Sequence, residues 1–107
     1  MEATMNADTA VYVPKPPGVV RVCMGGTRTV DHPLQPLATH DTLRNIYCGH
    51  IQLPQSDLDT YNRMTGEINR ATYHTDREFL LNQRHRFFVE AMYAQRDHLQ
   101  AQALQAA

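Results

Sequence analysis

Side chains able to bind metals or act as nucleophiles are present but scattered: the chain has six histidines and two cysteines. The one close pair lies in Cys48-Gly49-His50, and a zinc site would need further ligands from Cys23, His32 or His40. Structural zinc sites usually take paired ligands from two segments, so this spacing favours isolated histidines. Cys23 falls among valines, where a thiol behaves as a small apolar group. We therefore expect neither a metal site nor thiol catalysis.

The carboxylates and glycines also lack the spacing of a reactive site. Asp57 and Asp59 lie where a helix is expected to begin, and the positive end of a helix attracts acidic residues. Gly25-Gly26-Thr27 lacks the lysine and the longer glycine spacing of a phosphate-binding loop. The sequence therefore predicts a protein that is not an enzyme, with no catalytic residue, no cofactor and no small-molecule substrate.

The densest basic segment is Arg84-His85-Arg86, with Arg77 one to two helical turns before it. Glu78 and Glu90 lie close enough in the sequence to neutralise much of this charge. The formal net charge of the whole chain is −1, whereas nucleic-acid-binding domains usually carry a basic excess. We expect a solvated helix face here and no nucleic-acid site.

The length of 107 residues allows one small domain. Ile, Leu, Val, Met and Phe together account for 27 residues, so the core should be thin, and proteins with thin cores often gain stability from a partner. No segment has the run of about 20 apolar residues that a membrane-spanning helix needs, and two cysteines imply no disulfide framework. The sequence predicts a protein that is cytoplasmic when synthesised and makes no membrane contact.

The chain changes character near Ser56. All 6 prolines and 4 of the 5 glycines come before this residue, and the residues after it favour helices. The predicted class is α+β. Residues 1–55 would form an extended proline-containing arm, a β-hairpin and a short helix, and residues 56–107 a helical region of the same small unit. No motif identifies a known family.

The clearest local pattern in the first half is a β-hairpin between Gly18 and Val30. Two runs rich in β-branched residues flank Gly25-Gly26, which suits a two-residue turn. That turn would place Val22 opposite Thr29. Side chains that alternate along the first strand would form its buried face: Val20, Val22 and Met24.

A short helix is expected next, capped by Thr39 or Asp41 and ending near Gly49. A longer helix should begin at Ser56 as its N-cap. Its side chains then recur at helical spacing.

A further helix start lies at Thr75, with Glu78 three residues later in a capping-box pattern. Two arrangements are open. Either the chain breaks at residues 72–75 and forms two helices, or one continuous helix runs from residue 56 to the end. The poor helix formers in 72–75 favour the break.

The last helix should be longer than its own domain. From Asp76 to Leu104 it would contain 29 residues, or about 43 Å, whereas a compact domain of this size is about 35 Å across. Its C-terminal part should therefore either fray in water or lie along a neighbouring surface.

Apolar side chains of this last helix form the predicted partner-binding surface. A stripe at helical spacing is first of all a core stripe, but Phe79 and Tyr93 fall outside it. Aromatic and methionine side chains are enriched in interface cores. The predicted partner-binding residues are Phe79, Phe87, Phe88, Met92, Tyr93, Leu99 and Leu104.

Together these features favour a non-enzymatic structural or adaptor subunit of a larger protein assembly. Its partners would be other protein subunits, either copies of itself or a neighbouring assembly protein. Nine of the ten basic residues are arginine, a bias of GC-rich genomes that, with the small size, suggests a phage virion component or assembly factor. The alternative is a small regulator or inhibitor that binds a host protein or a nucleic-acid enzyme.

Overall fold

The computed structural model describes residues 14–47 and 51–106 as a β-hairpin and three helices. The hairpin consists of β1 (Val19–Gly25) and β2 (Arg28–Pro33). The helices are α2 (His40–Tyr47), α3 (Gln55–Arg70) and α4 (His74–Ala106). The predicted α+β class, with a hairpin, a short helix and two longer helices, is confirmed.

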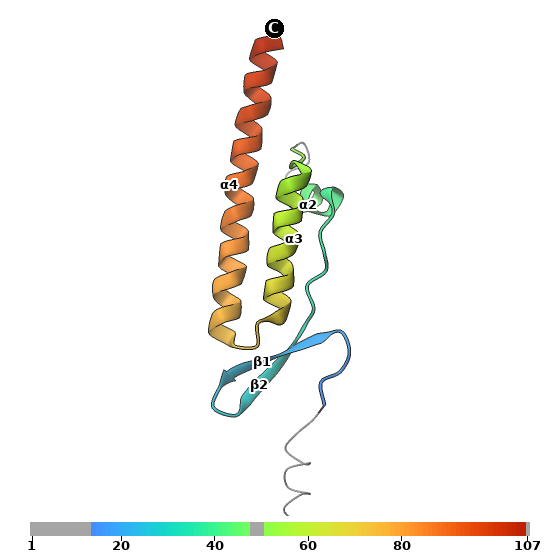
Figure 1. Ribbon diagram of the computed structural model, residues 1–107, viewed down its shortest axis with the longest axis vertical. Coiled ribbons are helices and arrows are strands. Elements are labelled where there is room, and N and C mark those ends of the chain that lie inside the picture. The colour runs from blue at the N-terminus through green and yellow to red at the C-terminus, as the bar shows by residue number, and fades with distance from the viewer. Residues whose placement is uncertain (1–13, 48–50, 107) are drawn as a thin grey trace, which may run out of the picture.

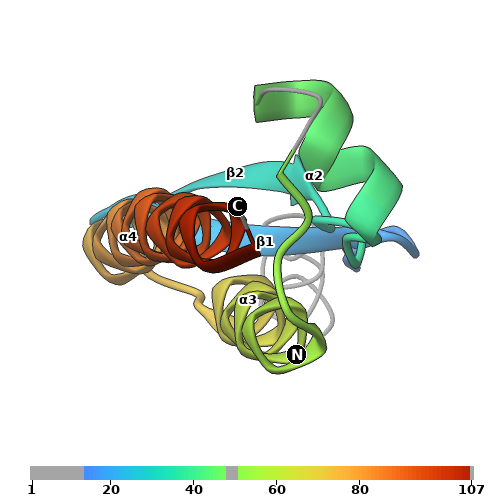
Figure 2. The ribbon, with the colours of Figure 1, turned by 90° about the horizontal axis from the view of Figure 1, so that it is seen from above.

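α3 and α4 lie side by side and antiparallel, and α2 lies level with the first part of α3 (Figure 1) but apart from it in the view along the helices (Figure 2). The hairpin lies at the end of the molecule where α3 turns into α4 (Figure 1). Figure 2, a view along the helices, shows that the strands run crosswise to the helix axes. The body is therefore a helical pair closed at one end by the hairpin.

α3 and α4 are separate helices because residues 71–73 leave the helical conformation. Ala71 is extended, with φ −74° and ψ 122°, so the alternative of one continuous helix is wrong. The backbone N–H of Cys23 donates to the Thr72 carbonyl at 2.7 Å, and Cys23 and Tyr73 form an isolated parallel bridge. The reversal between the helices thus also attaches β1 to them.

The hairpin lies where the sequence predicted it, but its register is shifted by one residue. Val22 pairs with Val30, whereas we expected Thr29. The shift arises from a bulge at Met24, which adds one residue to β1 before the turn. Glycines with positive φ at the turn permit this geometry. Val20 and Val22 still form the buried face, 6% and 0% exposed.

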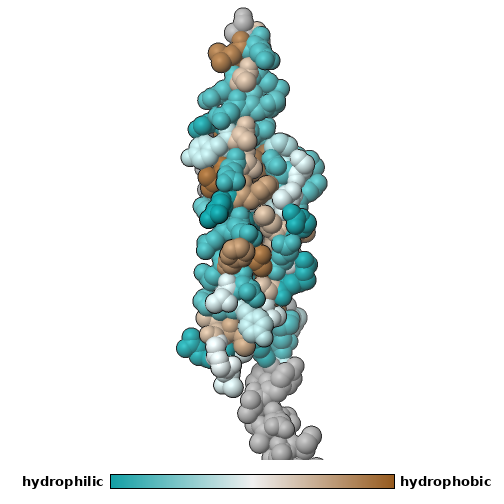
Figure 3. All heavy atoms as spheres, turned by 60° about the vertical axis from the view of Figure 1, so that its left-hand side comes forward, coloured by the Kyte–Doolittle hydropathy of each residue, from teal (hydrophilic) through white to brown (hydrophobic). Residues whose placement is uncertain are grey.

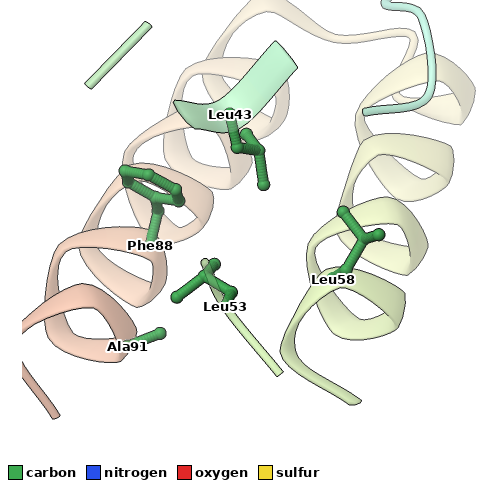
Figure 4. Packing of buried hydrophobic residues seen from close by; sticks show 5 residues of the cluster. All are labelled: Leu43, Leu53, Leu58, Phe88 and Ala91. Carbon is green, nitrogen blue, oxygen red and sulfur yellow. The ribbon is translucent and has the colours of Figure 1, made fainter. Parts of the chain in front are cut away.

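A small apolar cluster joins α2, α3 and α4. Its buried members, drawn in Figure 4, are Leu43, Leu53, Leu58, Phe88 and Ala91. The ring of Tyr61 meets that of Phe88 edge-on, with ring centroids 5.9 Å apart, which is a favourable aromatic geometry. Toward the hairpin, α3 contributes Thr65 and Ile68, both fully buried.

Two asparagines of α3 hold the loop between β2 and α2 along the helix. Asn69 Oδ1 accepts from the Gln35 N–H at 2.8 Å, and Asn69 Nδ2 donates to the Gln35 carbonyl at 2.9 Å. Asn62 makes the same two bonds with Ala38, at 2.8 and 2.9 Å. Residues seven apart lie on one helix face. The loop therefore has a fixed register on α3.

The expected start of α2 is confirmed, and that of α3 is wrong by two residues. Thr39 caps α2, because its Oγ1 accepts from the Thr42 N–H at 3.2 Å while Thr42 Oγ1 accepts from the Thr39 N–H at 2.8 Å. α3 begins after Pro54, with no side-chain hydrogen bond at its cap. Ser56 is therefore not the N-cap. The fixed φ of Pro54 suits the start of a helix without a side-chain cap.

α4 is twice as long as the helix against which it packs. It has 33 residues, about 50 Å, while α3 has 16 residues, about 24 Å. Figure 1 shows the C-terminal part of α4 extending past α3 and α2, and every residue from Arg96 to Ala106 is exposed. The predicted overhang is confirmed.

We predict that Asn69→Ala lowers the free energy of unfolding by about 1–2 kcal/mol, because two backbone groups of Gln35 lose their partner. Urea unfolding followed by circular dichroism measures this loss. Asn82→Ala on the exposed surface of α4 is the matched control and should change stability by less than about 0.5 kcal/mol. Equal losses in both variants would disprove the role of Asn69.

We also predict a pH dependence of the hairpin. Arg21 Nε and Nη2 donate to the two carboxylate oxygens of Asp31 at 2.8 and 3.1 Å. These bonds, with a smaller effect of the Arg21 charge, hold the pKa of Asp31 below its ordinary value of 3.8. Because the folded-state pKa is the lower one, the stabilisation is present above about pH 4 and is lost as the pH falls through that pKa.

Asp31→Asn should therefore be less stable than the wild type at neutral pH, and the difference should shrink as the pH falls below about 4. Urea midpoints measured across this range test it. A difference that stays constant into strong acid would mean that the pair contributes nothing through ionisation.

Candidate partner-binding surface

The structure divides the seven predicted partner-binding residues into an interior and an exposed group. Phe88 is 2% exposed and belongs to the apolar cluster. Phe87 and Met92 are partly buried against the same cluster. Figure 4 shows the Phe88 ring pointing from α4 toward Leu43 and Leu53. These three side chains hold α4 to the body.

The other four residues are available to another molecule. Their exposed fractions are 61% for Phe79, 55% for Tyr93, 40% for Leu99 and 79% for Leu104. Figure 3 shows brown apolar side chains along α4, separated by teal hydrophilic ones. The exposure of Phe79 and Tyr93, expected because they fall outside the core stripe, is confirmed.

These four residues lie on two sides of α4. An α-helix turns by about 100° per residue, so Phe79, Tyr93 and Leu104 fall within about 40° of one another. Phe88 lies about 180° from Phe79, on the side that packs against the body. Leu99 is rotated by about 140° from Leu104 and continues the inner side of the helix. Exposed apolar side chains therefore lie on two different sides of α4.

A groove lies where the inner side of α4 extends past the start of α3. We call it the fork groove. The connection that leads into α3 forms one wall through Leu53 and Pro54, and α4 forms the other through Gln95, His98 and Leu99. Leu53 is 4% exposed, so the floor of this groove is the edge of the apolar cluster. An apolar side chain entering the fork would extend the core.

A second groove, which we call the turn groove, lies at the reversal between α3 and α4. Tyr73 and Phe79, 60% and 61% exposed, line it together with charged side chains of both helices. Glu67, Arg70 and Asp76 supply those charges. Aromatic side chains are enriched in protein-binding surfaces.

Arg77 and Arg84 of α4 point into the interior. The expectation that the basic segment forms a solvated helix face is therefore wrong for these two residues. Arg84 Nη1 donates to Thr65 Oγ1 at 2.8 Å, its Nη2 donates to Gln35 Oε1 at 3.0 Å, and its guanidinium lies 4.8 Å from the centroid of the Tyr61 ring. One side chain thus joins α4, α3 and the loop before α2. Its charge is not offered to an outside ligand.

Arg77 is 4% exposed, and its Nη1 donates to the Ile68 carbonyl at 2.8 Å. This carbonyl lies in the last turn of α3, where the helix dipole is negative. Burial, and then the charge of Arg84, lower the pKa of Arg77, while Glu78 acts in the opposite direction. Arg77 therefore serves as a cap on the end of α3. The seven-residue spacing of Arg77 and Arg84 puts both on one face of α4, which is a sequence signal for their shared burial but not for the capping role of Arg77.

The residues considered for metal or thiol chemistry are not brought together where the structure describes them. Within residues 14–47 and 51–106 no three His, Cys, Asp or Glu side chains are grouped to hold a metal ion. Cys23 is half-buried, and Cys48 and His50 lie outside the described residues. His40 Nε2 is buried and has no hydrogen-bond partner among the described residues.

No family model, no curated protein and no solved structure matches this chain. Among the described helices, none is long and apolar enough to cross a membrane. The surfaces described above are therefore the basis for the assignment of a function.

We predict that Arg84→Met lowers the free energy of unfolding by about 1–3 kcal/mol, because Gln35 Oε1 loses its charged donor and Tyr61 its cation. Arg28→Met is the matched control, since Arg28 is exposed in the hairpin and should change stability by less than about 0.5 kcal/mol. Chemical unfolding of both variants tests this. A larger loss for Arg28→Met would reverse the assignment.

Proposed function

We propose that this protein is a non-enzymatic structural or adaptor subunit that binds neighbouring protein subunits in a larger assembly. One observation carries the proposal: α4 continues as a regular helix for eleven exposed residues, Arg96 to Ala106, beyond the body. Isolated helices shorter than about 12–15 residues are marginal in water. Contact with another subunit would stabilise this segment.

Apolar side chains at several places support a role in assembly. Leu99 continues the apolar cluster at the fork groove, and Phe79 and Tyr73 line the turn groove. In the loop between β2 and α2, Leu34 and Leu37 are 44% and 67% exposed. A subunit between neighbours needs contact areas on more than one side.

Two arginines inside the body have structural tasks, which supports the non-enzymatic part of the proposal. Arg77 caps α3, and Arg84 joins three segments through neutral oxygens and an aromatic ring. The setting that we propose is a particle such as a phage virion or its assembly intermediate. The support for that setting is the small size and the arginine bias of the chain.

We predict that tagged wild-type protein, recovered gently from its source cells, has the native mass of a stoichiometric complex with other subunits. Leu99→Asp should reduce recovery of the complex by at least about tenfold, because a charge would be buried in the fork groove. Thr27→Asp places the same charge in the exposed hairpin turn and should leave recovery unchanged. Thermal unfolding of both variants checks that the body remains folded.

Recovery of the wild type as a single free chain would overturn the proposal. Recovery with one host enzyme in equimolar amount would also overturn it, and would favour a small regulator or inhibitor.

A further inference from the structure

The outer side of α4 carries a regular pattern that hydropathy alone does not reveal. From Phe79 to Leu104, exposed residues follow one another at alternating spacings of four and three. This is the heptad spacing by which two helices pair along one seam. We call these eight positions the outer stripe. All eight are exposed, and they lie opposite Phe88, so the body does not cover them.

The outer stripe is self-complementary when it is read from both ends toward its middle. The first and last positions, Phe79 and Leu104, are both apolar, and the next two, Gln83 and Gln100, are both amides. Amide side chains can donate to and accept from one another.

The inner half of the stripe continues this matching. The third and sixth positions are Arg86 and Asp97, which are opposite charges, and the middle two are Glu90 and Tyr93, a carboxylate and a phenol donor. The spacing is also the same from either end, four, three, four and three residues. A sequence with these properties matches an antiparallel copy of itself.

We propose that α4 pairs through the outer stripe with α4 of a second copy of this chain, antiparallel, with a two-fold axis between Glu90 and Tyr93. Each of the four matched pairs then occurs twice, as a two-fold interface requires. The seam runs for 25 residue steps from Phe79 to Leu104, about 38 Å. This inference rests on the proposed function and names one of its partners.

Charge favours this orientation. In a parallel pair in register, Arg86 would face Arg86, Glu90 would face Glu90 and Asp97 would face Asp97, and like charges across a seam suppress pairing. In the antiparallel pair, Arg86 meets Asp97 of the second copy. Neither Arg86 nor Glu90 has a hydrogen bond or ion pair with any described residue of its own chain. The second copy would supply partners for both.

The ends of the stripe fit the same arrangement. Phe79 lines the turn groove beside Tyr73, and Leu104 is the most exposed large apolar side chain in the described part of the chain, at 79%. Antiparallel pairing would place Leu104 of the second copy against Phe79 at the mouth of this groove. The overhang of each chain would thus be covered by the base of α4 in the other.

Cysteine cross-linking of the full-length protein tests the register. In a background with Cys23→Ser and Cys48→Ser, Gln83→Cys and Gln100→Cys proteins are prepared separately. Mixed and mildly oxidised, they should form a disulfide-linked heterodimer. Each alone should stay unlinked, because two copies of position 83 would be about 25 Å apart. Gln83→Cys mixed with Gln102→Cys is the matched control and should give at most about a tenth of that product.

Charge exchange tests the chemistry, with wild-type self-association measured by sedimentation equilibrium. Arg86→Asp and Asp97→Arg should each weaken it by roughly tenfold, since each loses two ion pairs and gains repulsion. The double variant should recover it to within about threefold of the wild type, because the pairs are restored with reversed sign. Arg28→Asp at the start of β2 changes the net charge as Arg86→Asp does, and should have no effect.

Two results would overturn the pairing. One is a disulfide-linked homodimer of Gln83→Cys alone, which would require a different register. The other is a monomeric wild type at all concentrations with no product from the mixture. The second result, together with a stoichiometric complex of other subunits from source cells, would refute the pairing but leave the proposed function standing. A free single chain in both experiments would remove both.

Discussion

The structure depends on the polar bonds that α3 makes along its length. Asn62 and Asn69 hold the loop that leads from the hairpin to α2, Thr65 accepts from Arg84 of α4, and the last turn of α3 is capped by Arg77. These bonds are directional, so each fixes a register as well as a distance. A chain with few large apolar residues can in this way define one arrangement without a large core.

The second constraint is the unequal length of the two long helices. α3 can cover only about half of α4, because it has 16 residues against 33. The apolar cluster ends where α3 begins, near Leu53 and Leu58. Beyond that point the inner side of α4 continues with Leu99 but meets nothing of its own body. The overhang and the fork groove therefore have one origin, which is that α3 is about half as long as α4.

Much of this architecture could be predicted from the sequence. Proline and glycine placement separated the β-hairpin from the two long helices, and poor helix formers in 72–75 indicated the break before α4. The N-cap expected at Thr75 is wrong, because α4 begins at His74. The hairpin register could not be predicted, because no residue type in the sequence marks the bulge at Met24. This bulge shifts every cross-strand pair by one residue. The cap of α3 was misassigned because Ser56 has a favourable side chain, whereas the local backbone of Pro54 decided the start.

The candidate surface was predictable only in part. Phe79, Tyr93, Leu99 and Leu104 were identified as available side chains, and helical spacing already set Phe79 and Tyr93 apart from the core stripe. The contacts of Phe88 and the burial of Arg77 then establish which side of α4 faces the body. Arg77 was missed as an interior residue because an arginine is rarely so buried without a carboxylate partner. Its partner here is a helix-end carbonyl, which no sequence pattern displays.

The polar character of the outer stripe favours pairing between copies of the chain. If α4 were apolar on both sides, it would behave as a fully buried helix, and either side could pack against α3. Charged and amide groups on the outer stripe make the inner side the only one that the body can use. They also allow many wrong partners to be rejected, because each position needs a matching group in one register. A stripe with only its end positions apolar can thus leave the fold unambiguous and still specify a neighbouring chain. The resulting contact is weaker than an apolar one, and salt would screen its charged pairs.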